Sequence, residues 1–411
     1  MIHVAIPSMN EFFHLPGTME CLAMQQNADF QIWVCVNQPD DWWDNTEKQD
    51  VCENNKQSIS FLRELKRNNL HIIDHSSRGL GWGKKAFGVG QARKVLMDTI
   101  NRHANDNDII VSMDADTAIG PDYLQSISKV FSCHPNSVAL SNPYYHKLSG
   151  DDTLDRAMLR YEIYMRHYAI NMWRINSPYS FTALGSAIAL PVWAYRKVGG
   201  ITAKKSGEDF YFLQKLRKAG WICNHNAEKV YPGTRYSDRV FFGTGPALIK
   251  GSQGNWESYP VYDHRLFDKV KKTYEAFHHL FYEEVETPMS DFLRVQFRDE
   301  APFHALRKNA VSALQFVNAC HQKVDGLRVL QYLKSETAKV ERSDEYSLLS
   351  FFKRFHPGVF DNKTGNVATL STEDTEELKQ LTFTGSPIGL LDKIRNTLQG
   401  FEEEYQKNDL P

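Results

Sequence analysis

The segment Ile109-Ile110-Val111-Ser112-Met113-Asp114-Ala115-Asp116-Thr117 joins a short apolar run to two acidic residues. Such a run is typical of a buried strand. Alternate residues of an extended chain lie on the same face, so the carboxylates of Asp114 and Asp116 converge at the end of the strand. Close carboxylates repel each other, and a divalent cation that prefers oxygen ligands, Mg²⁺ or Mn²⁺, relieves the repulsion. The segment therefore predicts a metal site at a strand end.

The same spacing of two aspartates occurs in Asp106-Asn107-Asp108. This copy precedes the strand and belongs to a polar loop, so we do not expect it to bind metal.

Strand patterns continue on the N-terminal side of this segment. Short runs rich in apolar and β-branched residues predict strands at Ile2–Ile6, Ile32–Val36 and His71–Ile73. Between the last two lies Asp40–Asn69, a polar segment with aromatic residues that we interpret as an insertion.

Helical patterns alternate with these strands. Apolar residues recur at helical spacing from Val89 to Ile100, and Pro121 stands at the favoured first position of a second helix. A long helix over Leu154–Ile175 and a strand over Ser186–Leu190 follow. This alternation predicts an α/β fold with a doubly wound, mostly parallel sheet, which binds ligands beyond the carboxyl ends of its strands.

A second pair of acids, Glu208-Asp209, opens a helical pattern that ends near Gly220. Acidic residues at a helix start also complement the helix dipole, so the spacing alone leaves a structural and a chemical role open. Thr372-Glu373-Asp374 has a similar pattern in the C-terminal part, where we expect only an ordinary helix start.

Positive charge lies between the third and fourth strands, at Lys84 and Arg93. Cations there could neutralise a diphosphate, and a solvated helix face is the alternative. The glycines of Gly79–Gly83 do not have the GxGxxG spacing and no Walker loop is present, so a nicotinamide-dependent oxidoreductase is a poor fit.

The composition excludes several other classes of protein. The 411 residues hold 48 Lys and Arg against 50 Asp and Glu, a formal net charge of −2, which does not favour nucleic acid as a partner. The first residues lack a signal-peptide pattern, and no apolar stretch reaches the ~20 residues of a transmembrane segment. Six scattered cysteines are typical of reduced core thiols. We expect a cytoplasmic protein, free or peripheral to the inner face of the membrane.

Taken in order, these segments resemble the family 2 glycosyltransferases of the GT-A fold. The resemblance covers roughly residues 1 to 250 and is specific only as an ordered set. It rests on His3–Glu11, Ile32–Asn37, Gly90-Gln91-Ala92-Arg93-Lys94, Asp114-Ala115-Asp116 (the DxD motif), Gly185–Leu190, Tyr195–Gly200 and Gly207-Glu208-Asp209.

The sequence departs from the family pattern at three places. Lys94 replaces a usual Asn, and Asn37 stands where many members place an Asp that reads uracil, which leaves the donor open between UDP- and GDP-linked sugars. The Gln-x-x-Arg-Trp motif of processive synthases is missing, which favours transfer of single sugars.

The resemblance implies a set of site residues. Donor binding falls to Pro7, Asn10, Glu11, Asn37, Lys84, Arg93, Asp114, Ala115 and Asp116, and the acceptor side or its mobile loop to Gly185, Arg235 and Arg239. Asp209 is the implied catalytic base, with Glu208 beside it. Mn²⁺ or Mg²⁺ would be held by Asp114 and Asp116, with His225 or His264 as candidate third ligands.

The implied reaction is metal-dependent, inverting transfer of a sugar from a nucleotide-sugar donor to a hydroxyl of a carbohydrate or glycolipid acceptor. A carboxylate at a helix start is expected to stay ionised, as a base must. A retaining transferase of the same fold and a catalytically silent sugar-nucleotide-binding protein remain alternatives.

The domain organisation follows from where these motifs end. We predict a GT-A catalytic domain over residues 1–255, with a nucleotide-sugar half of about 1–120 and an acceptor half of about 121–255. Residues 256–411 have helical patterns at Phe267–Val285, Phe303–Cys320 and Leu378–Leu381 and are predicted to form a mainly helical C-terminal region. An oligomer is left open.

Overall fold

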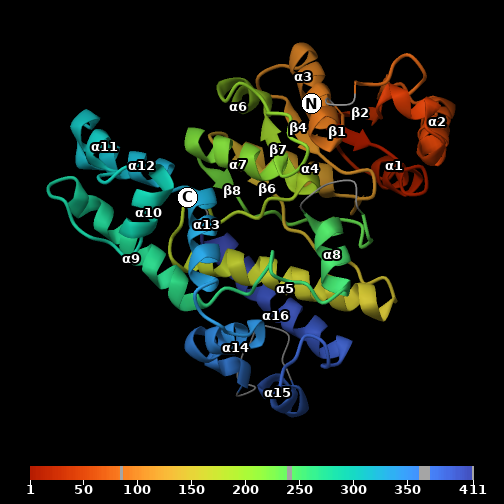
Figure 1. Ribbon diagram of the computed structural model, residues 1–411. Coiled ribbons are helices and arrows are strands. Elements are labelled where there is room, and N and C mark those ends of the chain that lie inside the picture. The colour runs from red at the N-terminus through yellow and green to blue at the C-terminus, as the bar shows by residue number, and fades with distance from the viewer. Residues whose placement is uncertain (84–86, 238–242, 361–370, 410–411) are drawn as a thin grey trace. The chain divides into compact units, whose positions relative to one another are not determined.

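A computed structural model describes residues 1–83, 87–237, 243–360 and 371–409. The chain divides into two compact units (Figure 1). The sheet unit comprises Met1–Met158, Phe181–Asn255 and Gln406–Pro411, and the helical unit comprises Leu159–Ser180 and Trp256–Tyr405. The predicted boundary after residue 255 stays a prediction. The segment Leu159–Ser180 lies before that boundary in the sequence but belongs to the helical unit.

The sheet unit contains every strand found among the described residues: β1 (Ile2–Ser8), β2 (Phe30–Asn37), β3 (Leu70–His75), β4 (Ile109–Ser112), β5 (Ala118–Ile119), β6 (Ala139–Ser141), β7 (Ile188–Pro191), β8 (Ile222–Cys223) and β9 (Val230–Tyr231). Its helices are α1 (Leu15–Ala23), α2 (Gln49–Glu64), α3 (Val89–His103), α4 (Tyr123–Cys133), α6 (Val192–Lys197), α7 (Glu208–Ala219) and α8 (Thr244–Ser252), with 3₁₀ turns η1 (Asp40–Asp44), η2 (Thr46–Lys48) and η3 (Gly185–Ala187). Helix α5 (Asp152–Arg174) begins in the sheet unit and continues into the helical unit.

The main sheet has the strand order β3-β2-β1-β4-β7-β6-β8. Strands β3, β2, β1 and β4 are parallel, and β7 is antiparallel to both of its neighbours. This confirms the predicted α/β fold with a mostly parallel sheet. The carboxyl ends of β1 and β4 therefore lie side by side, since Ala5 is in register with Ser112.

The crossover between β2 and β3 corrects the sequence interpretation of Asp40–Asn69 as an insertion. Most of this segment is helix α2, which packs on β2 and β3. Its buried face combines Cys52, Ile59 and Leu62 with buried Asn54 and Asn55, so its apolar stripe was too thin to recognise.

Two helix boundaries also differ from expectation. Helix α4 begins at Tyr123, so Pro121 precedes the helix and does not occupy its first position. The helix expected over Phe303–Cys320 is interrupted, because the hydroxyl of Ser312 accepts a hydrogen bond from the amide of Gln315 and starts a new helix there.

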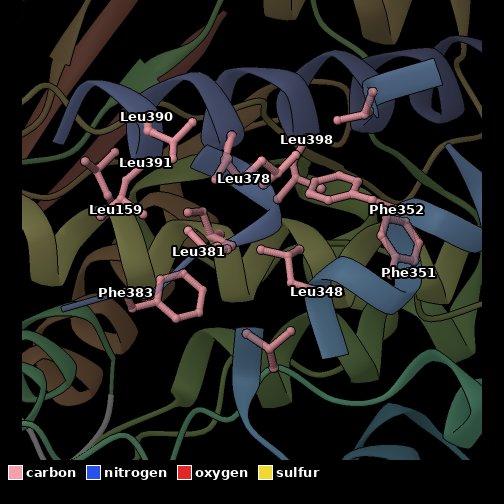
Figure 2. Packing of buried hydrophobic residues seen from close by; sticks show 14 of the residues in the cluster. Leu159, Leu348, Phe351, Phe352, Leu378, Leu381, Phe383, Leu390, Leu391 and Leu398 are labelled. Atoms are coloured by element: carbon pink, nitrogen blue, oxygen red, sulfur yellow. The ribbon is translucent and has the colours of Figure 1, made fainter. Parts of the chain in front are cut away.

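The helical unit holds α9 (His264–Leu280), α10 (Ser290–Phe297), α11 (His304–Asn309), α12 (Ala313–Lys323), α13 (Gly326–Thr337), α14 (Asp344–Phe355), η4 (Pro357–Phe360), α15 (Thr372–Lys379) and most of α16 (Ile388–Asn408). The expected helix start at Thr372 is confirmed, with a capping box between Ser371 and Asp374. Figure 2 shows the apolar core of this unit, in which Leu159 of α5 packs among residues of α14 and α16 such as Leu348 and Leu391. Each such buried side chain contributes about 1.5–3 kcal/mol to stability.

A buried ion network lies on α5 and α16 within the helical unit. Arg166 donates to Glu162 at 2.6 Å and to Glu402 at 2.5 Å, and Arg395 contacts Glu162 at 3.4 Å. Removing one partner of such a network typically costs 3–5 kcal/mol, about what a large buried side chain costs. The network therefore ties α5 firmly to α16.

The cysteines differ in burial. Cys35, Cys52, Cys223 and Cys320 are buried free thiols, whereas Cys133 is exposed. Among the described helices, none is both long enough and apolar enough to traverse a bilayer.

Candidate functional site

The acidic segment after β4 is held in place by its neighbours in the sheet unit. The amide of Met113 donates to the carbonyl of Ala5 at 3.1 Å. The buried hydroxyl of Thr18 contacts the carbonyls of Ala115 and Thr117 at 2.9 and 3.1 Å. The backbone between the two acids is thereby fixed on both sides, while the Asp114 side chain remains 38% exposed.

Arg93, on α3, joins this segment to the second acidic pair. Its Nη2 donates to Asp114 Oδ1 at 2.7 Å, and its Nη1 donates to Glu208 Oε1. The guanidinium is only 2% exposed. Burial lowers the pKa of Arg93, but Glu208 and Asp114 outweigh burial and raise it, so this side chain stays charged.

Glu208 and Asp209 form the first turn of α7, after Gly207 in a left-handed conformation (φ 71°). Glu208 is buried against Arg93, whereas Asp209 is half-buried and its Oδ1 accepts the amide of Phe210 at 2.7 Å. Burial raises the pKa of Asp209, and the charge of Arg93 opposes this only in part. Burial therefore acts against the helix start, which favours the ionised carboxylate, and the ionised state of Asp209 stays a prediction.

Arg235 forms an ion pair with Asp116, the second acid of the DxD segment. Strand β9 pairs antiparallel with β5, and this brings the following residues close to Asp116. Both Nε and Nη2 of Arg235 donate to Asp116 Oδ2, at 2.9 and 2.7 Å, and Nη2 also donates to Glu11 Oε1. Gly233 permits this approach, since a Cβ there would lie 3.0 Å from Asp116 Oδ2.

The turn after β1 is shaped by side chains of α2. Asn10 has a positive φ of 59°, and its amide donates to Asn55 Oδ1 at 2.7 Å. The amide of Phe12 donates to Asn54 Oδ1 at 3.0 Å. These two buried asparagines were missed at the sequence level, because the segment that carries them was not recognised as a helix.

The side chain of Asn37, at the end of β2, forms hydrogen bonds with two backbone groups. Its Nδ2 donates to the carbonyl of Ser8 at 3.0 Å, and its Oδ1 accepts the amide of Gly88 at 3.3 Å. Both polar atoms of the side chain therefore bind backbone groups at the end of β1 and the start of α3.

Asp106 and Asp108, which have the same spacing as the DxD pair, have structural partners. Asp106 pairs with Arg196, and Asp108 accepts the N-terminal ammonium at 3.1 Å and the amide of Asn105 at 2.8 Å. They hold the loop before β4.

Residues 109–299 match the profile of the family described as "Glycosyl transferase family group 2". The match begins at β4 and includes both acidic pairs. The chain is a glycosyltransferase whose residues 109–299 are similar to family group 2. No curated protein sequence matches it.

Solved structures similar to this glycosyltransferase are distant. TarS 1-349 of S. aureus in complex with UDP-GlcNAc is 14% identical, with 86% of this chain and 91% of that chain covered and a TM-score of 0.40. The mannosyltransferase PcManGT from Pyrobaculum calidifontis in complex with GDP-Man and Mn²⁺ is 13% identical, with 87% and 81% covered and a TM-score of 0.34. At such low identity and TM-score, these structures do not assign a role to any individual residue of this chain.

The side chains of this glycosyltransferase can be tested for their fit to a divalent cation. Within the described ranges, no three His, Cys, Asp or Glu side chains gather as a metal cage. Mg²⁺ is usually held by only one or two carboxylates, with substrate phosphates and water completing its shell. Asp114 and Asp116 follow β4, and each also contacts an arginine, Arg93 or Arg235. The two carboxylates Asp114 and Asp116 therefore fit a divalent cation whose remaining ligands come from a bound diphosphate and water.

Four further residues were predicted for the site from sequence: His225, His264, Lys84 and Arg239. His264 lies in the helical unit, where its Nε2 contacts Ser350 Oγ at 3.2 Å, and His225 follows β8. Both stay predictions as metal ligands. Lys84 and Arg239 lie outside the described residues.

Proposed function

We propose that this glycosyltransferase moves a sugar from a nucleotide-sugar donor to an acceptor hydroxyl with inversion, and that Asp114 and Asp116 hold the divalent cation the reaction needs. One observation carries the proposal. Through Arg93, the donor-side acid Asp114 and the start of α7, with Glu208 and Asp209, belong to one ion-paired cluster at the carboxyl end of β4.

The cation would supply charge stabilisation at the departing diphosphate when bound. Asp114 and Asp116 are its proposed protein ligands. Asp116 Oδ2 also accepts two hydrogen bonds from Arg235, so Arg235 and a cation would share this carboxylate.

Asp209 is the proposed general base. Its neighbour Glu208 is buried and paired with Arg93, whereas Asp209 is half-buried. Asp209 takes the proton of the acceptor hydroxyl, whose oxygen bonds to the anomeric carbon as the bond from that carbon to the diphosphate breaks. A raised pKa makes Asp209 a stronger base than an ordinary aspartate.

The first experiment is a thermal-shift screen of nucleotide sugars with and without Mn²⁺, in which UDP-GlcNAc and GDP-Man are convenient first probes. A ligand at ~100 times its dissociation constant should stabilise the protein by about 2.7 kcal/mol. Asp116→Asn should abolish the Mn²⁺-dependent part of the shift, and Asp106→Asn is the matched control. No shift with any nucleotide sugar contradicts the proposed donor class.

The product then separates the alternatives. With a donor and acceptor in hand, the anomeric configuration of the product by NMR distinguishes inverting from retaining transfer. Donor binding without hydrolysis or transfer to any acceptor would indicate a silent sugar-nucleotide-binding protein.

A further inference from the structure

The guanidinium of Arg93 is enclosed between two acids that lie far apart in the sequence. Asp114 follows β4 and Glu208 opens α7, and each accepts a hydrogen bond from a different Nη atom of Arg93. With 2% of its surface exposed, the side chain has little room for a third large partner such as a diphosphate. This differs from the donor-binding role that the sequence suggested for it.

Two glycines lie close to Arg93 and its helix. A Cβ at Gly185 would lie 2.4 Å from Arg93 Nη2, so a larger residue there would displace the guanidinium from its two acids. A Cβ at Gly90, one turn before Arg93 on α3, would lie 2.0 Å from the carbonyl oxygen of Lys204. The chain leading into α7 therefore packs directly on the start of α3.

From these contacts we infer that Arg93 is a positioning residue that locks the start of α7, and with it Asp209, to the donor-side acid Asp114. The inference rests on the proposed function for its link to catalysis. Arg93 spans the two acids because its planar fork offers separate N–H groups to each, whereas the single ammonium of a lysine cannot hold the same geometry. In this role Arg93 sets the geometry of transfer and does not bind the donor.

Arg93→Lys keeps the charge but removes the fork, and is the variant of choice. We expect kcat to fall by roughly 100-fold, the loss that a misplacement of about 1 Å can produce, while the dissociation constant for the nucleoside diphosphate with Mn²⁺ changes less than about threefold. Arg196→Lys is the matched control: this arginine also pairs with an aspartate in the sheet unit, but it is 40% exposed and lies away from the site. It should leave both quantities unchanged.

A double-mutant cycle tests the bridge itself. Glu208→Gln and Arg93→Lys both disrupt the same ion pair. The activation free energy lost in the double variant should therefore be smaller than the sum of the losses in the two single variants. Additive effects, a normal kcat in Arg93→Lys, or a loss of diphosphate affinity with kcat retained would each overturn the inference. The last result would make Arg93 a donor ligand.

A further measurement does not depend on turnover. Amide hydrogen exchange at residues 208–211 should be at least about tenfold faster in Arg93→Lys, while α16 keeps its protection. If the wild-type protein binds no nucleotide sugar, the proposed function is wrong. The exchange data would still test whether Arg93 holds the start of α7 in place. Unchanged exchange at the start of α7 would show that Arg93 does not hold it.

Discussion

Asp209 and Glu208 are neighbours in sequence with different surroundings. Adjacent residues in a helix point in different directions, so one acid faces Arg93 while the other does not contact it directly. Glu208 is buried in an ion pair, and Asp209 is half-buried beside it. This difference supports the proposal that Glu208 holds Arg93 while Asp209 accepts the proton.

Replacing Asp209 by Asn should lower kcat by roughly 10²–10⁴-fold, the usual contribution of a general base. Asparagine keeps the shape but cannot accept the proton, so donor affinity in calorimetry should change little. Glu208→Gln should be milder, since it disrupts the ion pair with Arg93 but leaves the proposed proton acceptor in place. A larger loss of kcat in Glu208→Gln than in Asp209→Asn would reverse the assignment.

The pH dependence of kcat should report Asp209. Burial raises the pKa of this carboxyl, while Arg93 lowers it, and Asp114 raises it further. Because the base must be deprotonated, kcat is present above this pKa and is lost as the pH falls through it. The acidic limb of the profile should therefore lie above the ~3.9 of an ordinary aspartate. It should be missing from the residual activity of Asp209→Asn.

At the scale of elements, the pairing of β5 with β9 decides what surrounds the DxD segment. This pairing places the residues after β9 near the DxD segment, where Arg235 contacts Asp116 and Glu11. Arg235 was assigned from sequence to the acceptor side or a mobile loop, and its described contacts are with residues assigned to the donor.

Arg235→Gln should bind Mn²⁺ more tightly than the wild type when no nucleotide is present. The guanidinium contacts Asp116 Oδ2 twice, so its removal frees a carboxylate oxygen for the cation. An increase in affinity of about threefold or more, measured by calorimetry, corresponds to the strength of a partly exposed ion pair. Arg78→Gln, which removes an exposed arginine paired with Asp44, serves as the control. Weaker Mn²⁺ binding in Arg235→Gln would contradict competition for Asp116.

At the scale of the whole molecule, α5 belongs largely to the helical unit although it lies early in the chain. Leu159, Ile163 and Ile170 of this helix are buried in the core that α14 and α16 complete. Charges within that core reinforce the arrangement, because Arg166 of α5 pairs with Glu402 of α16.

Truncation after Asn255 should therefore yield an aggregating protein. The fragment would retain α5 but lose α14 and α16, which exposes Leu159, Ile163 and Ile170 to water. Solubility after expression and the elution volume in gel filtration measure the outcome. Replacing these three residues by Lys or Glu in the fragment should restore solubility. A soluble unmodified fragment of monomer size would contradict this account of the core.

The sequence by itself determined the local parts of this protein. Apolar runs predicted β1 to β4 and β7, the acids after β4 and at the start of α7 were located correctly, and their order resembled the family that the profile match bears out. Strand and helix periodicities report which face of a single element is buried, and that information is local. Helix α2 was not predicted, because the polar residues Asn54 and Asn55 interrupt the apolar pattern of its buried face.

Only the tertiary structure decided how these parts meet. Arg93 and Glu208 are 115 positions apart, and Arg235 and Asp116 are 119 apart, so no spacing rule could pair them. Their contacts depend on strand order, on the pairing of β5 with β9 and on glycines that allow close approach. The same holds for α5, whose periodicity predicted a helix but not the unit in which it is buried. Ion pairs and packing act through space, and the fold alone sets those distances.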